Sequence, residues 1–375
     1  PSPVDHEYRL TDLAHRLIRS GRRVDSYQIY DQDEVLGINT RENLNQAAFI
    51  LQKRIYRPRR HEERNVISFG TGGWRAVIGE GFTLHNVRRL CQALANAVAR
   101  RGEEAKGMLI GYDRRFLSDR AGRAAAEVFA GNNIPVVLLE EDAPTPLVTY
   151  ATADLNAAYG LVFTASHNPP EWNGLKVFRS DGSLLQDHEV ASIQEEANRL
   201  STDDVVKIDL DLAFDAGVVT RQDYTNAYVD AVEALIDLDS IRDAGLRVIV
   251  DPMYGVSQLT LGIILTEARC RVTFINERHN PLFGGRSPAP DMEALRLLQT
   301  HVRNENYDLG LATDGDADRI AIVDESGTYV TVNDILLLTY WYLHEIREER
   351  GGVVRNLATT HLLDRLAKHF GEEAY

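Results

Sequence analysis

The sequence predicts an α/β protein of successive units in which helices cover mixed, largely parallel sheets, preceded by a helical N-terminal extension. Three observations support this prediction. Short apolar runs typical of buried strands alternate with amphipathic helical patterns from about residue 65 onward. A polar linker, Ser201 to Asp204, separates two stretches that each show this alternation. Glycine-rich or acidic motifs follow several predicted strands, where the loops of an α/β sheet bind ligands.

Composition limits the possible classes of function. The 375 residues are 44% hydrophobic and 26% charged, which is ordinary for a globular protein, and they suffice for two or three domains. With 56 acidic against 41 basic residues, the formal charge of −15 disfavours nucleic acid and anionic membranes as partners. Two cysteines in apolar elements and the lack of a bilayer-spanning apolar run predict a cytoplasmic protein.

Residues 1–64 are predicted to form the helical extension, and they carry no chemical motif. Apolar residues recur there at helical spacing in two segments, and Asn39 followed by Glu42 is typical of a helix N-cap. The apolar positions are Leu10, Leu13, Leu17 and Ile18 in the first segment, and Leu44, Ala47, Ala48, Leu51 and Ile55 in the second.

The first α/β domain is expected to cover residues 65–204. A glycine-rich stretch, 70–75, lies near its start, and Gly182 marks a turn between two short strands. Strands that alternate with helices predict a largely parallel sheet. The predicted strands are 108–110, 135–139 and 159–163, and the predicted helices are 87–98, 121–130, 147–153 and one that ends at Leu200.

The same alternation predicts a second domain over residues 205–323 and the start of a third over residues 324–375. We expect the third domain to be incomplete, because no further strand follows to complete its sheet. The predicted strands are 247–250, 271–275, 309–312, a pair around 325–327, and 353–358; the predicted helices are 224–235, 259–265, 292–302, 334–345 and 362–370.

Ser166 is a candidate nucleophile. In Thr164-Ala165-Ser166-His167-Asn168-Pro169 it follows an apolar strand, on a turn that would expose its hydroxyl at the strand tip. The alternative is a polar loop in which Ser166 and Asn168 bond their own backbone and Pro169 ends the strand. A serine hydrolase is disfavoured, because the Gly-x-Ser-x-Gly elbow is absent and the adjacent His167 could not easily turn back to act as the base.

A second motif, Asp314-Gly315-Asp316-Ala317-Asp318-Arg319, follows the strand predicted at 309–312. Three carboxylates that converge on one point repel each other unless a cation lies between them, and oxygen ligands favour Mg²⁺. An acidic surface turn is the plain alternative. A calcium loop of the EF-hand kind is a sharper one, but Arg319 stands where that loop requires glycine, and residues 320–323 are predicted as strand instead of helix.

A serine near a divalent-metal site is suited to phosphoryl transfer, because a metal and basic groups neutralise the phosphate that is transferred. Arg75, Lys176 and Arg319 are the candidates for these basic groups.

Together these motifs resemble those of the α-D-phosphohexomutases, the phosphoglucomutase and phosphomannomutase family. The resemblance rests on Thr-Ala-Ser-His-Asn-Pro-Pro, Asn-Gly-x-Lys and Asp-Gly-Asp-Ala-Asp-Arg, in that order, and covers residues from about 65 to 375. Supporting matches are Gly-Thr-Gly-Gly-Trp-Arg at 70–75 and Gly-Tyr-Asp-Arg-Arg at 111–115. The resemblance implies a phosphohexomutase-like fold of four domains, so this chain would lack the fourth and be part of a longer mutase.

The resemblance also implies a role for each matching residue. Ser166 would carry the phosphate, and Mg²⁺ would be held by that phosphate and by Asp314, Asp316 and Asp318. Arg319 would lie beside the phosphoserine. Lys176 would act as a base or as an electrostatic stabiliser, and His167 as an orienting donor, while a solvated lysine and a turn histidine remain the plain alternatives. Phosphate or substrate would also contact Arg75, Asn168 and Lys176.

The activity that the resemblance implies is a shift of phosphate between the 1- and 6-hydroxyls of a hexose, without ATP. It would proceed through the phosphoserine and a hexose 1,6-bisphosphate, which also serves as activator. The alternative is a catalytically inactive, metal-dependent protein of the same fold that binds sugar phosphates or has a regulatory role.

The sequence does not match two further family motifs: the sugar-selecting Gly-Glu-x-Ser-Gly loop and the phosphate loop of the fourth domain. The preferred hexose phosphate therefore stays open between glucose, mannose and glucosamine phosphates, although Thr164 and Pro170 resemble the glucose and mannose enzymes. The oligomeric state stays open as well.

Overall fold

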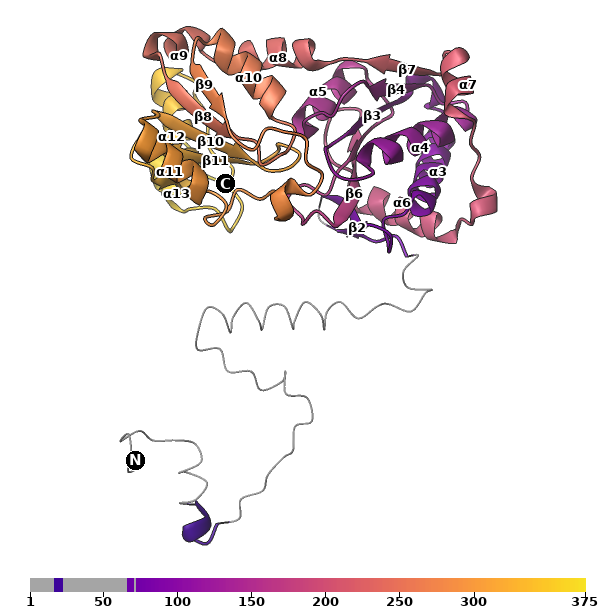
Figure 1. The fold of residues 1–375 in the computed structure, drawn as a ribbon, viewed down its shortest axis with the longest axis horizontal. Coiled ribbons are helices and arrows are strands. Elements are labelled where there is room, and N and C mark those ends of the chain that lie inside the picture. The colour runs from indigo at the N-terminus through magenta and orange to yellow at the C-terminus, as the bar shows by residue number, and fades with distance from the viewer. Residues whose placement is uncertain (1–16, 23–65, 71) are drawn as a thin grey trace. The chain divides into compact units, whose positions relative to one another are not determined.

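The fold is described from a computed structural model that defines residues 17–22, 66–70 and 72–375 (Figure 1). The chain divides into two compact units, Pro1–Glu63 and Arg64–Tyr375. Most of the extension predicted for residues 1–64, including its N-cap at Asn39, lies outside the described residues. Within 17–22, residues 17–19 are helical.

The second unit contains a seven-stranded sheet in the order β1-β2-β6-β5-β3-β4-β7. Strands β5, β3, β4 and β7 are parallel, whereas β6 is antiparallel to both of its neighbours. The sheet is therefore mixed, as predicted, with three parallel and three antiparallel pairings. Its strands are β1 Phe69–Gly70, β2 Gly73–Val77, β3 Met108–Tyr112, β4 Val136–Leu139, β5 Tyr159–Phe163, β6 Trp172–Arg179 and β7 Val219–Gln222.

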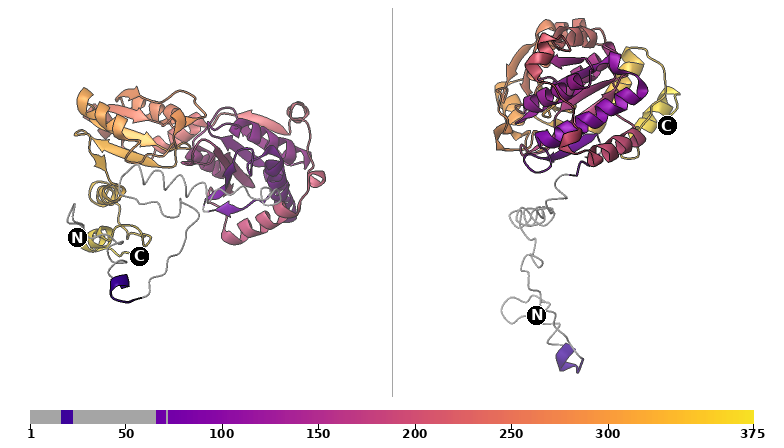
Figure 2. Two further views of the ribbon diagram at one scale, coloured as in Figure 1. Left: turned by 60° about the horizontal axis from the view of Figure 1, so that its bottom comes forward. Right: turned by 90° about the vertical axis from the view of Figure 1, so that its right-hand side faces the viewer.

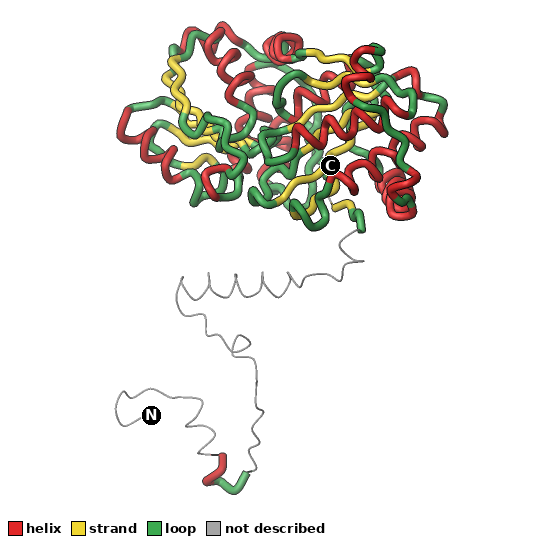
Figure 3. The backbone as a smooth tube through the Cα atoms, turned by 45° about the vertical axis from the view of Figure 1, so that its right-hand side comes forward, coloured by secondary structure: helices red, strands yellow, loops and turns green. Residues whose placement is uncertain are grey.

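Helices cover both faces of this sheet because its central strands are apolar on both faces. On β3, Met108 and Ile110 pack into a cluster with α3, α4 and α6, while Leu109 points to the opposite cluster with α5. Figures 2 and 3 show the strands as a layer between helices. The helices are α3 Leu84–Arg101, α4 Ser118–Gly131, α5 Thr145–Asp154, α6 Asp187–Arg199 and α7 Leu210–Asp215.

A second sheet, of five strands in the order β12-β11-β10-β8-β9, follows further along the chain. Strands β9, β8 and β10 are parallel, and β11 and β12 run antiparallel. Helix α11 packs on one face and α10 on the other. The elements are β8 Arg247–Asp251, β9 Arg271–Phe274, β10 Leu309–Thr313, β11 Ile320–Asp324, β12 Tyr329–Val330, α8 Thr225–Glu233, α9 Leu238–Ala244, α10 Gln258–Glu267 and α11 Arg296–Glu305.

Two strands lie on the other side of the expected domain boundaries. Strand β7 follows the boundary expected at residue 204, yet Val219 pairs with Val136 of the first sheet. Strand β12 follows the boundary expected at residue 323, yet Val330 pairs with Ile322 of the second sheet. The sequence predicted no strand at β7 and assigned the strand pair around 325–327 by its position along the chain, whereas the hydrogen-bond ladders assign β7 and β12 to the sheets that precede them.

The strand predicted over residues 353–358 is wrong. Val353 makes one isolated bridge with Ala374, and Val354 and Leu357 are 80% and 90% exposed. Valine favours strands, but a strand also needs a partner along its length, and this segment pairs only briefly with the last residues of the chain. The helices on either side are α12 Val332–Trp341, which continues in a π turn Tyr342–Ile346, and α13 Leu362–Phe370.

The carboxyl ends of parallel strands bring the sequence motifs together. Asp113 directly follows β3, Ser166 lies just past β5, and Asp314 directly follows β10. Loops at this end of α/β sheets form ligand sites. Within the described residues, no helix is both long and apolar enough to cross a membrane.

Gly174 on β6 lies so close to the backbone on either side that no side chain fits there. A Cβ at this position would overlap the carbonyl oxygen of Trp74 and lie 2.9 Å from that of Thr164. We predict that Gly174→Ala destabilises the fold by about 2 to 3 kcal/mol, because backbone atoms of two strands would have to move. Urea unfolding measures this change.

Gly122→Ala is the matched control, because its Cβ would meet only side chains at 3.4 Å or more inside helix α4. It should be neutral or stabilise by up to about 1 kcal/mol. Equal stability of Gly174→Ala and the parent would contradict the close approach.

Candidate active site

Ser166 lies on a tight turn after β5 and is 1% exposed. Its φ of 53° is in the left-handed region, and its N–H donates to Oγ1 of Thr164 at 2.8 Å, which closes the turn. The Ser166 hydroxyl donates to Oδ2 of Asp314 at 2.7 Å, and Nδ1 of His167 lies 3.4 Å from the same hydroxyl oxygen. The turn therefore directs the hydroxyl to the acidic loop of the second sheet.

A buried arginine, Arg115, holds this turn through its backbone carbonyl groups. The guanidinium of Arg115 donates to the carbonyl oxygens of Ser166 (2.5 Å), Asn168 (2.7 Å), Pro169 (2.8 Å) and Trp172 (3.0 Å). Four carbonyls directed at one cation hold the loop in a single conformation.

Asp113 in turn positions this arginine. One carboxylate oxygen accepts from the Arg115 N–H at 3.0 Å and from the Ser118 hydroxyl at 2.8 Å. The other accepts from the Thr164 hydroxyl at 2.6 Å and lies 3.3 Å from Nε of Arg115. Burial raises the pKa of Asp113, and the neighbouring Arg115 and the three donors act in the opposite direction.

The acidic loop connects β10 to β11 and turns within a few residues. Oδ1 of Asp314 accepts from the backbone N–H groups of Asp318 and Arg319 at 3.1 and 3.0 Å, and Ala317 has a φ of 57°. This turn brings one carboxylate oxygen from each of Asp314, Asp316 and Asp318 within 4.8 Å of the others. The three carboxylates, which alternate along the sequence, thus converge. Strand β11 follows them, where a calcium loop of the EF-hand kind would be followed by a helix.

Lys176, on β6 of the first sheet, compensates part of this negative charge. Its ammonium lies 2.6 Å from Oδ2 of Asp316 and 2.5 Å from Oδ2 of Asp318. Burial lowers the pKa of Lys176, but the two carboxylates outweigh burial, so its pKa is raised and the ammonium is retained.

The remaining charge is unfavourable. Burial first, and then the charges of Asp316 and Asp318, raise the pKa of Asp314 to about 7. Oδ1 of Asp316 is buried and has no hydrogen-bond partner. Oxygen donors, excess negative charge and an unpartnered buried oxygen fit a hard divalent cation such as Mg²⁺.

The other predicted basic residues surround the turn. Nη1 of Arg75 donates to Oδ1 of Asn168 at 3.2 Å. The side chain of Arg319 is exposed beside the acidic loop. Burial, together with the positive charges of Arg319 and Arg75, lowers the pKa of His167, so its ring is neutral at pH 7.

The turn and the acidic loop are packed against one another. A Cβ on Gly315 would lie 2.8 Å from the carbonyl oxygen of Ser166 and 3.0 Å from Cγ of Pro288. The ring of Phe283, from the second sheet's long loop, lies 4.9 Å from the Arg115 guanidinium carbon. Any side chain at position 315 would separate the hydroxyl from the carboxylates.

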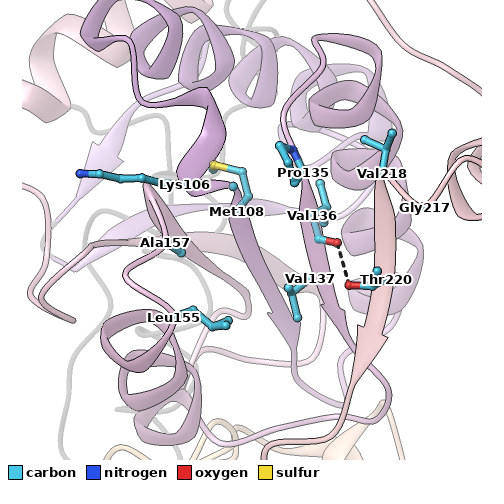
Figure 4. A pocket seen from close by; sticks show the side chains of 11 residues that line it. Lys106, Met108, Pro135, Val136, Val137, Leu155, Ala157, Gly217, Val218 and Thr220 are labelled. Atoms are coloured by element: carbon cyan, nitrogen blue, oxygen red, sulfur yellow. Dashed lines mark hydrogen bonds between the residues drawn. The ribbon is translucent and has the colours of Figure 1, made fainter.

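Two hollows elsewhere lack such chemistry. One, of about 120 Å³, lies where β3 and β4 begin, whereas Ser166 lies beyond the carboxyl end of β5 (Figure 4). Mostly apolar groups line it, and its Lys106 is already paired with Glu103 at 2.7 Å. The other, of about 380 Å³, is an open depression at Phe214 and Arg221. Neither contains a group of nucleophile, acid and base.

Comparison with known proteins agrees with the motifs and the fold. The family models of phosphoglucomutase/phosphomannomutase α/β/α domain I and domain II match residues 66–204 and 226–327. A crystal structure from Thermus thermophilus, assigned as a phosphomannomutase, is 32% identical with a TM-score of 0.73, covering 82% of this chain and 68% of that one. The chain belongs to the α-D-phosphohexomutase family.

Curated phosphohexomutases are similar at the same level. A phosphoglucomutase/phosphomannomutase from Thermococcus kodakarensis is 31% identical over 81% of this chain and 65% of its own length. A protein assigned as a phosphoglucosamine mutase, from Methanothermobacter thermautotrophicus, is 32% identical over 74% of this chain and 58% of its own length. This chain thus spans roughly three fifths of the curated phosphohexomutases it matches.

Three residues of this candidate site were missed by sequence reasoning. Asp113 and Arg115 were noted only as part of a supporting motif, although Gly111 to Arg115 directly follows a predicted strand. Thr145, whose hydroxyl donates to Oδ2 of Asp316 at 2.6 Å, begins helix α5. The available indication was Pro144-Thr145-Pro146, which is typical of a helix start and does not reveal a contact with residue 316.

The Arg115 hub yields a stability prediction. Arg115→Lys keeps the charge but cannot reach four carbonyls, and it leaves Asp113 without its fork-shaped partner. Because a broken buried ion pair is costly, we expect a loss of about 3 kcal/mol or more in the free energy of unfolding. Urea denaturation is the measurement.

Arg100→Lys is the control: Arg100 pairs with Glu196 at 2.7 Å on the surface, and its side chain is 54% exposed. Its loss should stay within about 0.5 kcal/mol. If both variants unfolded at the same urea concentration, Arg115 would not support the turn.

Proposed function

We propose that the chain acts as a phosphohexomutase, an intramolecular phosphotransferase that moves phosphate between the 1- and 6-hydroxyls of a hexose phosphate. Phosphorylated Ser166 would donate its phosphate to the free hydroxyl, and the resulting hexose 1,6-bisphosphate would return the other phosphate to Ser166. The observation that carries this proposal is the hydrogen bond of 2.7 Å from the buried Ser166 hydroxyl to Asp314 of the acidic loop.

In each transfer one bond to phosphorus breaks and another forms. In the transfer to the sugar, the sugar oxygen attacks phosphorus and the bond from phosphorus to Ser166 Oγ breaks. The sugar hydroxyl loses its proton, and Ser166 Oγ gains a proton. Neutral His167, 3.4 Å from Oγ, is suited to handle a proton there. Lys176 is paired with both Asp316 and Asp318, an arrangement that suits electrostatic stabilisation.

Basic side chains would bind the negatively charged substrate. Arg75, held to Asn168, and the exposed Arg319 are the proposed phosphate contacts beside Ser166. Asp314, Asp316 and Asp318 would hold Mg²⁺. When bound, this ion supplies positive charge that neutralises the phosphoryl group during transfer.

The substrate is proposed at the level of hexose phosphates, and glucose 1-phosphate is the first to test, followed by mannose 1-phosphate. Similar proteins are assigned to glucose, mannose and glucosamine phosphates. Thr164 is one of the residues that resemble the glucose and mannose enzymes. Its hydroxyl bonds Asp113 and the Ser166 N–H, so it stabilises the turn and adds no information on the sugar.

Phosphorylation of Ser166 can be tested directly. We expect the parent to take up label from radioactive glucose 1,6-bisphosphate, the proposed activator, and Ser166→Ala to take up none, because the accepting oxygen is gone. Ser183→Ala, which removes an exposed hydroxyl from a surface turn, should take up as much label as the parent. Label on Ser166→Ala equal to the parent would refute the assignment, and a parent that binds hexose phosphate without labelling would favour the non-catalytic alternative.

Mg²⁺ binding tests the acidic loop separately. Asp316→Asn should weaken Mg²⁺ binding by about tenfold or more, because one charged ligand of three is lost. Titration calorimetry measures the affinity, and Asp203→Asn, an exposed carboxylate in the linker, should leave it unchanged. The same affinity in Asp316→Asn and the parent would identify the loop as an ordinary acidic turn.

A further inference from the structure

Thr145, the first residue of helix α5, contacts Asp316 of the acidic loop through both its backbone and its side chain. Its N–H donates to the Asp316 carbonyl oxygen at 2.9 Å, and its hydroxyl donates to Oδ2 of the same residue at 2.6 Å. Thr145 is 5% exposed and Asp316 is fully buried. Two bonds between the same two residues prevent rotation of the loop at this point.

The two oxygens of Asp316 have very different surroundings. Oδ2 accepts from the Thr145 hydroxyl and from Lys176 Nζ, both at 2.6 Å. Oδ1 is buried without a hydrogen-bond partner. A buried carboxylate oxygen left bare is unfavourable by itself, so a cation is the partner that its position favours.

We propose that Thr145 is a positioning residue for the metal site: its hydroxyl fixes the rotation of the Asp316 carboxylate so that Oδ1 faces the ion. This inference rests on the proposed Mg²⁺ site. Groups that hydrogen-bond a metal ligand orient it and raise the affinity of the site. The start of α5 adds to this effect, because the positive end of a helix dipole stabilises the carboxylate.

The arrangement also explains why one hydroxyl is needed beside Lys176. A lysine has a flexible stem and three rotatable donors, so it accompanies a carboxylate without fixing its plane. Thr145 is β-branched and lies in the first turn of a helix, so its hydroxyl has few accessible positions. The threonine therefore supplies orientation, and the lysine supplies charge.

Mn²⁺ replaces Mg²⁺ at oxygen sites and is counted directly by electron paramagnetic resonance, so it is the probe for the whole 375-residue chain. Thr145→Val keeps the shape and removes only the hydroxyl. We expect its Mn²⁺ affinity to fall about tenfold. Thr145→Ser, which keeps a hydroxyl, should stay near the parent. Thr149→Val is the matched control on the same helix, because the Thr149 hydroxyl donates to Pro146 instead of the acidic loop.

A merely structural role would give a different result. It would lower the thermal midpoint of Thr145→Val without metal and leave the Mn²⁺ affinity unchanged, which would overturn the inference. Equal weakening in Thr145→Ser and Thr145→Val would overturn it too, because the hydroxyl would then not matter. If Thr145→Val does not fold, Thr145→Ala removes the same hydroxyl and takes its place in the comparison.

The same titration separates this inference from the metal site on which it rests. If the parent binds no Mn²⁺, the proposed metal site fails and the positioning role of Thr145 fails with it. If the parent binds Mn²⁺ and Thr145→Val binds it equally well, only the positioning role is overturned.

Discussion

Repulsion among three carboxylates in one short loop is the constraint on which the arrangement of the site depends. Asp314 and Asp316 are fully buried, and ionised groups are removed from water only when other groups compensate them. The compensation comes from elsewhere in the chain: an ammonium on β6, a hydroxyl on α5 and the Ser166 hydroxyl after β5. The acidic loop of the second sheet thus depends on side chains that the first sheet and its helix α5 supply.

The first sheet has its own buried charge, and it solves the problem differently. Arg115 is surrounded by backbone carbonyls of the turn it supports and by the carboxylate of Asp113. All of its partners are supplied by neighbouring strands and their loops, so no added ion is required. The charge of this buried cation is balanced within the protein by Asp113, whereas the cluster of anions retains excess negative charge.

Much of the fold was predictable because strands and helices alternate with clear apolar periodicity. Strand β10 and the acidic turn after it, for example, follow directly from Leu309 to Asp318. Tertiary pairing was not predictable in the same way. Nothing within residues 219–222 indicates that β7 joins the edge of the first sheet, and nothing within residues 353–358 indicates that this segment pairs through a single bridge instead of a strand ladder.

The candidate site shows the same limit. Ser166 and the three aspartates belong to compact motifs, so the sequence alone singled them out. Arg115 and Thr145 act through contacts with residues 51 and 171 positions away in the chain. Their importance depends on which carbonyl or carboxylate lies beside them, and local patterns contain no information about such distances.

The left-handed backbone of Ser166 has a consequence for chemistry. Threonine also carries a hydroxyl that could accept a phosphate, and by reactivity alone it would be an acceptable replacement. A φ of 53° is tolerated by small residues but is unfavourable for a β-branched one, whose second branch crowds the backbone. The turn that presents the hydroxyl to Asp314 therefore selects serine over threonine by backbone conformation, not by reactivity.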